Sequence, residues 1–402
     1  MHIAFLNPSG QLGGAELCLL DMLAFLHQSR PEWRLTVILG EPGPLSSRAA
    51  ALADVQVLRF PQRVASLGDS GATGRSALFA STLRAAPAAI AYRRKLRATL
   101  HGSNPDIIHT NGLKMHLLGA WAKPRNAKLI WHVHDYASSR PIMARLLSRF
   151  QSQADLVIAN SESVAQDIRK LLPGKKVVPI LNVVDLNEFS PQGPILPTPG
   201  IAPGTVKVGL VATMAWWKGH RLFLDALAKL DRRLNVHGFV IGGALYQTAS
   251  QQQSVNSLKE YANRLGIADR VTFTGFVDNP AAAMRMLDVV VHASTEPEPF
   301  GRVIVESMGC GKPVISSGKG GAAEVLRMGE FALTFESGNS ASMAGAISRL
   351  VQDVNLRSRL GSNGLNAARL RFGRERLATE LIPLYEECLM NRERNKARGA
   401  HA

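Results

Sequence analysis

The chain has 402 residues, a length that allows two large domains. Hydrophobic residues make up 46% of it but form no apolar run of eighteen, so no transmembrane helix is expected. The three cysteines are far apart and form no Cys-x-x-Cys pair, and the eleven histidines show no zinc spacing. A reducing cytoplasm is therefore the simplest compartment, and no structural metal is expected. The formal net charge of +16 favours anionic partners, whether small molecules, phospholipid surfaces or nucleic acid.

The amino terminus is read directly as a first strand at residues 3–6, and not as a signal peptide. A loop rich in turn-forming residues follows and contains Gly13 and Gly14, after which the pattern predicts a helix from Leu17 to Leu26. Glycines at this place allow close approach of a phosphate, although two adjacent glycines can equally form a tight turn.

The segment Leu83–His101 has a helical pattern with apolar positions such as Ile90, Leu96 and Leu100. It also carries a concentration of positive charge. A basic helix of this kind can contact an anionic membrane or a charged acceptor, and the alternative is an ordinary solvated face. The basic residues are Arg84, Arg93, Arg94, Lys95 and Arg97.

Two further strands are predicted at Asp106–His109 and Leu129–Asp135. Strand alternation places His132 and His134 on the same face of the second of these strands. A buried histidine with satisfied hydrogen bonds is the structural interpretation of either residue, and His132 is interpreted in this way.

A boundary between domains is predicted at residues 191–204, where five prolines and three glycines exclude a regular element. The following domain opens with a strand at Val206–Ala212 and a loop at Thr213–Trp217. A helix is then expected to begin at Lys218–His220.

The stretch Val289–Leu326 combines an apolar strand, a loop broken by prolines and by Gly301, a helix and a second apolar strand. Open α/β sheets bind ligands at the carboxyl ends of their strands, and the amides at a helix start favour an anion. Glu298 and Glu306 frame the loop, with seven residues between them, and can bind hydroxyls. A solvated loop before a surface helix is the alternative interpretation.

The sequence E-P-F-G-R-V-I-V-E-S-M-G-C-G-K-P-V-I, which starts at Glu298, resembles the donor-site signature of the retaining glycosyltransferases of family 4, in the large GT-B group. The segment Gly320–Val325 resembles the next loop of that family, and G-G-A-E from Gly13 resembles its amino-terminal loop. The pair His134–Asp135 matches the His-Asp pair at a strand end of the amino domain. The resemblance covers nearly the whole chain and is weakest at residues 61–104.

The resemblance implies an α/β protein of the GT-B fold, with two doubly wound Rossmann-like domains facing across a cleft. An acceptor-side domain is expected at 1–190, a linker at 191–204 and a nucleotide-sugar domain at 205–372. Residues 373–402 are expected to form a helix that crosses back to the first domain, and a frayed tail. The implied reaction is glycosyl transfer from a UDP- or GDP-sugar to a hydroxyl, with retention, in glycan, polysaccharide or glycolipid biosynthesis. Neither a cofactor nor a metal is required.

The resemblance also implies roles for individual residues. His134 would line the sugar pocket and Glu298 would orient sugar hydroxyls, so these two form the expected catalytic set. The family's usual arginine is replaced by Thr213, which leaves the two-cation clamp on the diphosphate incomplete, and Arg302 either supplies the missing charge or is simply exposed. Glu306 would bind the ribose. The expected donor-binding set is Gly13, Gly14, Lys218, Phe300, Gly301, Arg302, Val303 and Glu306.

The expected partners are a nucleotide-sugar donor, a sugar, lipid-linked or small-molecule acceptor, and an anionic membrane surface through Leu83–His101. An inactive GT-B protein that only binds a nucleotide sugar is an alternative, because of the departure at Thr213. A phosphorylase or an epimerase on the same fold is also open. A nucleic-acid binder is suggested by charge alone; no nucleic-acid motif is present and aromatic residues make up 6%.

Overall fold

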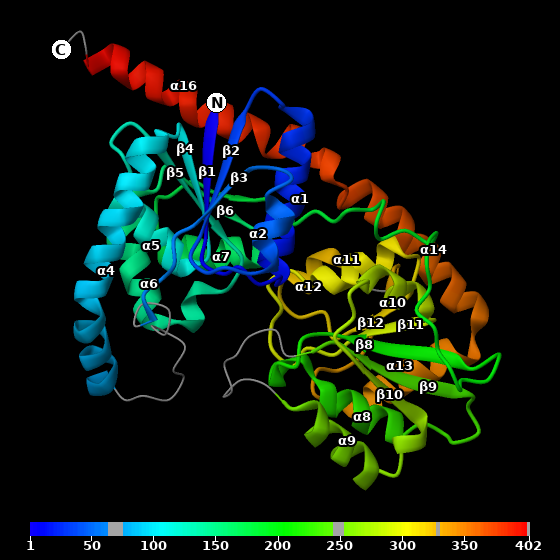
Figure 1. Ribbon diagram of the computed structural model, residues 1–402. Coiled ribbons are helices and arrows are strands. Elements are labelled where there is room, and N and C mark those ends of the chain that lie inside the picture. Colours follow the sequence, from blue (N-terminus) through cyan, green and yellow to red (C-terminus); the bar gives the residue numbers. More distant parts are fainter. Residues whose placement is uncertain (63–74, 244–252, 327–329, 400–402) are drawn as a thin grey trace. The chain divides into compact units, whose positions relative to one another are not determined.

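The structure, a computed structural model, describes residues 1–62, 75–243, 253–326 and 330–399 (Figure 1). For residues 75–83 and 391–399 it describes the backbone alone. The chain divides into two compact units, each described below by itself. Unit 1 comprises Met1–Val183 and Arg374–Ala402, and unit 2 comprises Val184–Gly373.

Unit 1 contains a parallel sheet of seven strands in the order β3-β2-β1-β4-β5-β6-β7. Its central strands are mostly apolar and are buried on both sides, as a parallel sheet with two helical layers requires. The strand order reverses between β1 and β4, which makes the carboxyl ends of these strands the expected binding edge. The strands are β1 (His2–Asn7), β2 (Arg34–Leu39), β3 (Asp54–Val57), β4 (Ile107–Asn111), β5 (Lys128–Val133), β6 (Leu156–Ala159) and β7 (Val177–Pro179).

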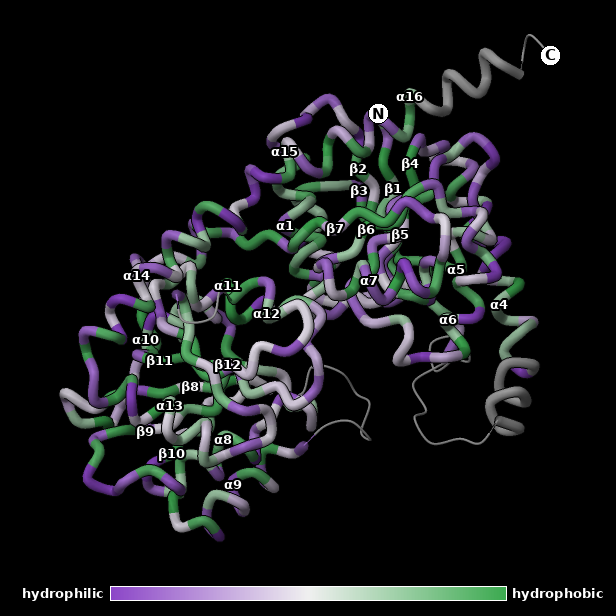
Figure 2. The backbone as a smooth tube through the Cα atoms, turned by 180° about the vertical axis from the view of Figure 1, so that it is seen from behind, coloured by the Kyte–Doolittle hydropathy of each residue, from purple (hydrophilic) through white to green (hydrophobic). Residues whose placement is uncertain are grey.

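Helices cover both faces of this sheet and form a separate core on each (Figures 1 and 2). One layer consists of α1 (Gly14–Ser29), α2 (Pro44–Ala49), α15 (Leu377–Glu380) and α16 (Ile382–Gly399). The other consists of α4 (Arg75–Ser103), α5 (Leu113–Ala122), α6 (Pro141–Phe150) and α7 (Glu162–Leu171). The helix predicted at Leu83–His101 is therefore confirmed as the main part of α4, whereas the preceding residues 63–74 lie outside the described part.

The carboxyl-terminal segment belongs to unit 1, but it is not the single helix that the resemblance implies within residues 373–402. It forms a 3-10 turn, η6 (Arg374–Arg376), and then α15 and α16 in succession. The break precedes Pro383, which has no backbone N–H to continue a helix. Arg374 forms an ion pair with the buried Asp21 of α1, and Tyr385 is fully buried, so this segment is fixed on the α1 layer.

Unit 2 contains a second parallel sheet, of six strands in the order β10-β9-β8-β11-β12-β13. These strands are β8 (Val206–Val211), β9 (Val236–Ile241), β10 (Val271–Gly275), β11 (Val289–His292), β12 (Val314–Ser316) and β13 (Ala332–Thr334). The helices are α8 (His220–Ala228), α9 (Val255–Arg264), α10 (Pro280–Met286), α11 (Arg302–Gly309), α12 (Gly321–Val325), α13 (Ser340–Gln352) and α14 (Val354–Arg371). The predicted fold class, two Rossmann-like α/β units, is confirmed.

The boundary between the units lies at Val183–Val184, seven residues before the predicted position. The buried Arg285 of α10 explains the difference. Its guanidinium donates to the backbone carbonyls of Glu188, Ser190 and Pro194 at 2.7, 2.9 and 3.0 Å. The start of the proline-rich stretch is thereby fixed to unit 2. In the described part of the chain, no helix is both long enough and apolar enough to cross a membrane.

Candidate active site

The loop between β11 and α11 lies at the carboxyl end of its strand, as the sequence predicts. Gly301 is the N-cap of α11 and has φ +86°, a conformation that favours glycine. A Cβ atom at this position would also lie 2.8 Å from Ile304 Cδ1. The loop is closed by a backbone hydrogen bond of 2.8 Å from Gly321 to the carbonyl of Glu298. The start of α11 therefore has a fixed geometry beside Glu298.

The carboxylate of Glu298 is buried, and its polar partners include Lys218, Ser294 and His292. Lys218 Nζ donates to its two oxygens at 2.7 and 2.9 Å, Ser294 Oγ donates at 2.7 Å, and His292 Nε2 lies 3.4 Å away. Burial alone would raise the pKa of Glu298, but Lys218 and His292 outweigh it and hold the pKa well below its usual range. Glu298 is therefore an ionised, immobilised carboxylate.

Lys218 reaches this carboxylate from a distant part of the chain. It ends the short 3-10 helix η3 (Trp216–Lys218), directly after β8 and the Thr213 loop. Its ammonium also lies 4.0 Å from the ring centroid of Trp217, a cation–π contact. The structure thus brings together two residues predicted for the donor site, Lys218 and Glu298.

Glu306 and Arg302 form a second buried ion pair one turn apart on α11. Arg302 Nε donates to Glu306 Oε1 at 2.7 Å, and the two side chains are 10% and 7% exposed. The alternative of a simply exposed Arg302 is therefore wrong. The guanidinium neutralises Glu306, so each glutamate of the motif has a cation partner.

Phe300 and Val303 support this loop in different ways. The Phe300 ring is 2% exposed and packs edge-on against Phe372, with ring centroids 6.0 Å apart. It anchors the loop in the core, which leaves its backbone for contact with a ligand. Val303 is half-buried in the first turn of α11.

In unit 1, Gly13 is the N-cap of α1 and Gly14 is its first residue, at the carboxyl end of β1. A Cβ atom on Gly14 would meet no atom within 4 Å, so packing does not require glycine there. Glu16, absent from the predicted set, is buried beside them and accepts from Asn7 Nδ2 at 3.2 Å. Burial raises the pKa of Glu16. Its place in the G-G-A-E stretch was the signal that could have identified it.

His134 lies at the end of β5 within a row of polar side chains. Its Nε2 donates to Asn111 Oδ1 at 3.2 Å, and its ring lies 4.0 Å from that of His132, centroid to centroid. The alternation that places both histidines on one face is confirmed. Burial lowers the pKa of His134 to about 4, so the imidazole is neutral at pH 7. His132 in turn contacts His109, at 3.1 Å.

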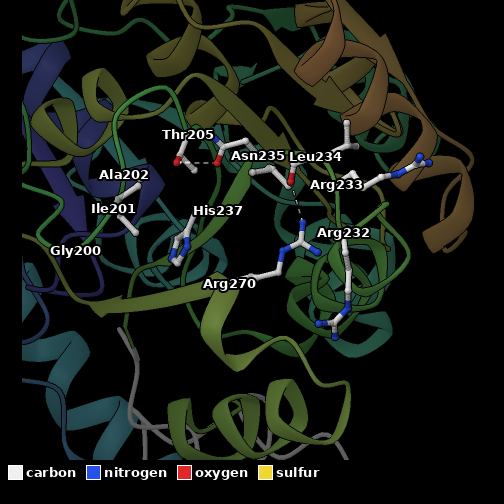
Figure 3. Close-up of a pocket in the computed structure, with 11 residues that line it drawn as sticks. Gly200, Ile201, Ala202, Thr205, Arg232, Arg233, Leu234, Asn235, His237 and Arg270 are labelled. Carbon is white, nitrogen blue, oxygen red and sulfur yellow. Dashed lines mark hydrogen bonds between the residues drawn. The ribbon is translucent and has the colours of Figure 1, made fainter.

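A hollow of about 420 Å³ in unit 2 is not part of these loops (Figure 3). It lies at the opposite edge of the sheet, where β9 and β10 begin, and Arg232, Asn235, His237 and Arg270 line it. Arg232 and Arg270 donate to the backbone carbonyls of Gly266 and Leu234. None of the predicted site residues lines this hollow.

Two family profiles match the chain. "Glycosyltransferase Family 4" matches residues 12–188, and "Glycosyl transferases group 1" matches residues 197–367. The chain belongs to the family 4, group 1 glycosyltransferases. The Gly13 loop and His134 lie in the first matched region, and the Lys218, Glu298 and Glu306 sites lie in the second.

Solved structures of this fold cover almost the whole chain. Anabaena HepE in complex with UDP superposes with a TM-score of 0.77 at 28% identity, over 96% of this chain and 100% of that one. HepE has also been solved with UDP-glucose, with a TM-score of 0.76. Sucrose-phosphate synthase from Thermosynechococcus elongatus has a TM-score of 0.76 at 20% identity, which shows the fold alone.

Curated relatives agree with the family. The lipopolysaccharide core biosynthesis glycosyltransferase LpsE of Rhizobium meliloti is 28% identical over 239 residues, which is 59% of this chain and 66% of LpsE. The N-acetyl-alpha-D-glucosaminyl L-malate synthase of Bacillus anthracis is 23% identical over 321 residues, 77% of this chain and 82% of that protein.

Proposed function

We propose that this glycosyltransferase transfers a sugar from a UDP-sugar to a hydroxyl group, with retention of anomeric configuration. The observation that carries the proposal is the pair of buried carboxylates, Glu298 and Glu306, on either side of the α11 start, with Lys218 on the first of them. HepE, 28% identical over nearly the whole chain, has been solved with UDP and with UDP-glucose, which favours uridine over guanosine.

The donor's diphosphate carries the largest charge that this site must neutralise. The amino-terminal end of α11 offers backbone N–H groups and a partial positive charge, and Lys218 offers a full one. The Lys218 ammonium contacts both oxygens of Glu298 and has three N–H donors, so it can also donate to a phosphate beside this carboxylate. The carboxylate oxygens have further lone pairs that can accept a hydrogen bond from a sugar hydroxyl. Diphosphate binding and sugar binding would thus be coupled through one ion pair.

Within this proposal, Glu306 binds the ribose hydroxyls and His134 lines the sugar pocket as a neutral imidazole. No side chain acts as nucleophile; the departing phosphate accepts the proton of the acceptor hydroxyl on the same face of the sugar. Stabilisation of the departing diphosphate by Lys218 and by the α11 amides replaces a metal ion. Activity that is lost with EDTA and restored by manganese would contradict this metal-free scheme.

The decisive experiment measures binding and turnover separately. Calorimetry with UDP-, GDP- and ADP-glucose should show preferential binding of the UDP-sugar. NMR of the glycoside formed on a lipid-linked or core-oligosaccharide acceptor should show the anomeric configuration of the donor. An inverted product would refute retention. Binding without transfer or hydrolysis on any acceptor would support the alternative, an inactive nucleotide-sugar-binding protein; the Thr213 position is the feature that favours it.

We further propose that unit 1 associates peripherally with an anionic membrane at the cytoplasmic face, where it meets a lipid-linked acceptor. Between residues 75 and 154 the sequence has thirteen Lys and Arg and two acidic residues, Asp106 and Asp135. The helices α4, α5 and α6 of this region lie side by side on one face of unit 1 (Figures 1 and 2). None of the three cysteines, all of which lie in the described part of the chain, forms a disulfide, and this is compatible with a reducing compartment.

The α6 helix is the best candidate for contact with lipid. Ile142 and Leu146, one turn apart, are 48% and 41% exposed, and the neighbouring Arg145 and Arg149 are exposed beside them. Apolar side chains flanked by arginine are typical of a helix that lies in a membrane interface. On α4, Arg94, Lys95 and Arg97 are exposed. Arg93 is not: its guanidinium stacks on Trp121 at 4.6 Å and donates to the Trp121 carbonyl.

Vesicle flotation tests this association without any substrate. The protein should bind phosphatidylcholine vesicles that contain phosphatidylglycerol, and not vesicles of phosphatidylcholine alone. Replacement of Arg94, Lys95 and Arg97 by Ser should weaken binding on the order of hundredfold, at about 1 kcal/mol for each charge. The variant Leu370→Ser, at an 81% exposed position in unit 2, is the matched control for I142S/L146S. Unchanged binding of both α4 and α6 variants would refute the proposal.

A further inference from the structure

Three aromatic side chains in the interior of unit 1 lead from the carboxyl-terminal helix to His134. Tyr385 of α16 contacts His109 of β4, and His109 contacts His132 of β5, with separations of 2.8 and 3.1 Å between the bonded atoms. Tyr385 and His109 are 0% exposed and His132 is 4% exposed. This chain of contacts joins residues that are 276 and 23 positions apart in the sequence, and no motif of the donor site includes them.

In this series of hydrogen bonds one direction of donation is favoured, from Tyr385 towards His132. The Tyr385 hydroxyl can donate to His109 Nδ1 at 2.8 Å or to the Met22 thioether at 3.7 Å, and a thioether is a weak acceptor. Burial raises the pKa of Tyr385 well above its usual value, so the phenol keeps its proton. Burial lowers the pKa of His109 to about 3, so this imidazole is neutral and carries one N–H.

The protonated nitrogen of each imidazole can then be deduced in turn, first for His109 and then for His132. With Nδ1 of His109 accepting from Tyr385, the single proton of His109 lies on Nε2 and is donated to His132 Nδ1. His132, also neutral because burial lowers its pKa, must then carry its own proton on Nε2. In the opposite direction Tyr385 would have to accept from His109 and donate to the distant Met22 sulfur, which exchanges a strong hydrogen bond for a weak one.

The hydrogen-bonded series Tyr385–His109–His132 ends against the ring of His134. The rings of His132 and His134 are 4.0 Å apart between centroids and inclined by 36°. On its other side, His134 Nε2 donates to Asn111 Oδ1, which leaves His134 Nδ1 as the unprotonated nitrogen. His134 is thus held between Asn111 and an imidazole whose tautomer is set by Tyr385.

We propose that Tyr385 and His109 are positioning residues for His134: they lock the tautomer and orientation of His132, on which the His134 ring rests. This inference deepens the proposed function and rests on it, because it assigns a catalytic purpose to the orientation of His134. It also makes the Tyr385 hydroxyl a determinant of turnover, although its hydrogen-bond partners are His109 and Met22 and not the residues predicted for the donor site.

The test is Tyr385→Phe, which keeps the ring and removes only the hydroxyl. We expect kcat to fall on the order of tenfold, as for a catalytic group displaced by less than 1 Å, while KM for the UDP-sugar stays within about twofold. The matched control is Tyr92→Phe. Tyr92 is 1% exposed in the same unit, and its hydroxyl has no hydrogen-bond partner among the described residues. Tyr92→Phe should leave kcat and KM unchanged.

Nitrogen-15 NMR of histidine-labelled protein tests the chain independently of activity. In the wild type, His132, assigned by the loss of its signal in His132→Gln, should have its proton on Nε2; in Tyr385→Phe it should show both tautomers. Equal kcat for the two Tyr variants would overturn the positioning role. A proton on Nδ1 of wild-type His132 would overturn the chain even if Tyr385→Phe failed to fold. If the wild type transferred no sugar, the proposed function would fail, and the tautomer of His132 would still decide whether the chain exists.

Discussion

Replacement of Lys218 by Met should destabilise unit 2 far more than the loss of a surface ion pair, because Glu298 remains buried. The side chains of Lys218 and Glu298 are 17% and 11% exposed, and the ammonium donates to both carboxylate oxygens. Removal of one partner of a buried ion pair costs about 3–5 kcal/mol. Ser294 and His292 remain near the carboxylate, so we expect about 3 kcal/mol at pH 7.

The loss should depend on pH in a defined direction. In the wild type, the lowered pKa of Glu298 contributes stability above the unfolded value of 4.5, which is lost only as the pH falls through the folded value. Without Lys218, burial is no longer opposed by the ammonium, and the pKa of Glu298 should rise. The difference in the free energy of unfolding between the wild type and Lys218→Met should therefore be largest at neutral pH and should become smaller towards pH 4.5.

Hydrogen–deuterium exchange measures the opening free energy locally, on the peptide that contains β11 for Lys218→Met and on the peptide that contains β7 for the control. The control is Lys176→Met, which removes a similar contact to Glu387 at 2.8 and 2.9 Å between side chains that are 52% and 47% exposed. This control should cost about 0–1 kcal/mol. The double variant K218M/E298Q should recover most of the stability. Equal, small losses for K218M and K176M would refute the reasoning.

Three further predictions follow from the same structure. Unit 1 should lose stability in mild acid, because burial lowers the pKa of His134 to about 4 and that of His109 to about 3. Below pH 6.5 the unfolded chain therefore binds more protons than the folded one, and each histidine should lower the free energy of unfolding by about 1.4 kcal/mol per pH unit. A melting temperature that is the same at pH 7.5 and 5.5 would contradict this. Gly301→Ala should destabilise more than Gly275→Ala in thermal melting, because both have positive φ but only the former meets a side chain within 3 Å. Glu306→Ala should weaken UDP-sugar binding in calorimetry by about tenfold to hundredfold, since it removes hydrogen bonds from a charged group; unchanged affinity would remove Glu306 from the site.

Much of the fold could be predicted from the sequence because its information is local. Apolar runs bounded by glycine and proline predict the central strands of both sheets, although not β13. The order strand, loop, helix, strand at Val289–Leu326 is the β11-α11-β12 unit of the structure. Residues 340–352 and 354–372 also have a helical sequence pattern, and these ranges agree with α13 and α14 to within one residue. The cap of α7 is also local: Ser161 accepts from the Val164 amide, as its position predicts.

The partners of the site residues could not be predicted, because they come from distant parts of the chain. Lys218 and Glu298 are 80 positions apart, and Tyr385 and His109 are 276 positions apart. Sequence spacing indicates which residues reach a strand end, but not which strand ends are neighbours or which side chain turns inward. For this reason the sequence indicates no partner for His132 and does not single out Glu16, although both are buried beside predicted site residues.

Replacement of Gly14 by Ala can separate an effect on function from an effect on folding. Its φ is outside the left-handed region, and a Cβ atom there would meet no protein atom within 4 Å, so Gly14→Ala should fold normally. Because alanine is the better helix former, the variant should gain up to about 1 kcal/mol of stability. If a donor phosphate approaches this backbone in the proposed reaction, the added methyl group will obstruct it, and affinity for the UDP-sugar or kcat should fall while melting temperature does not. A substitution of the adjacent Gly13 cannot separate the two effects in this way, since Gly13 is the N-cap of α1. A Gly14→Ala variant with wild-type affinity and kcat would mean that this loop keeps its glycine for a reason other than the donor.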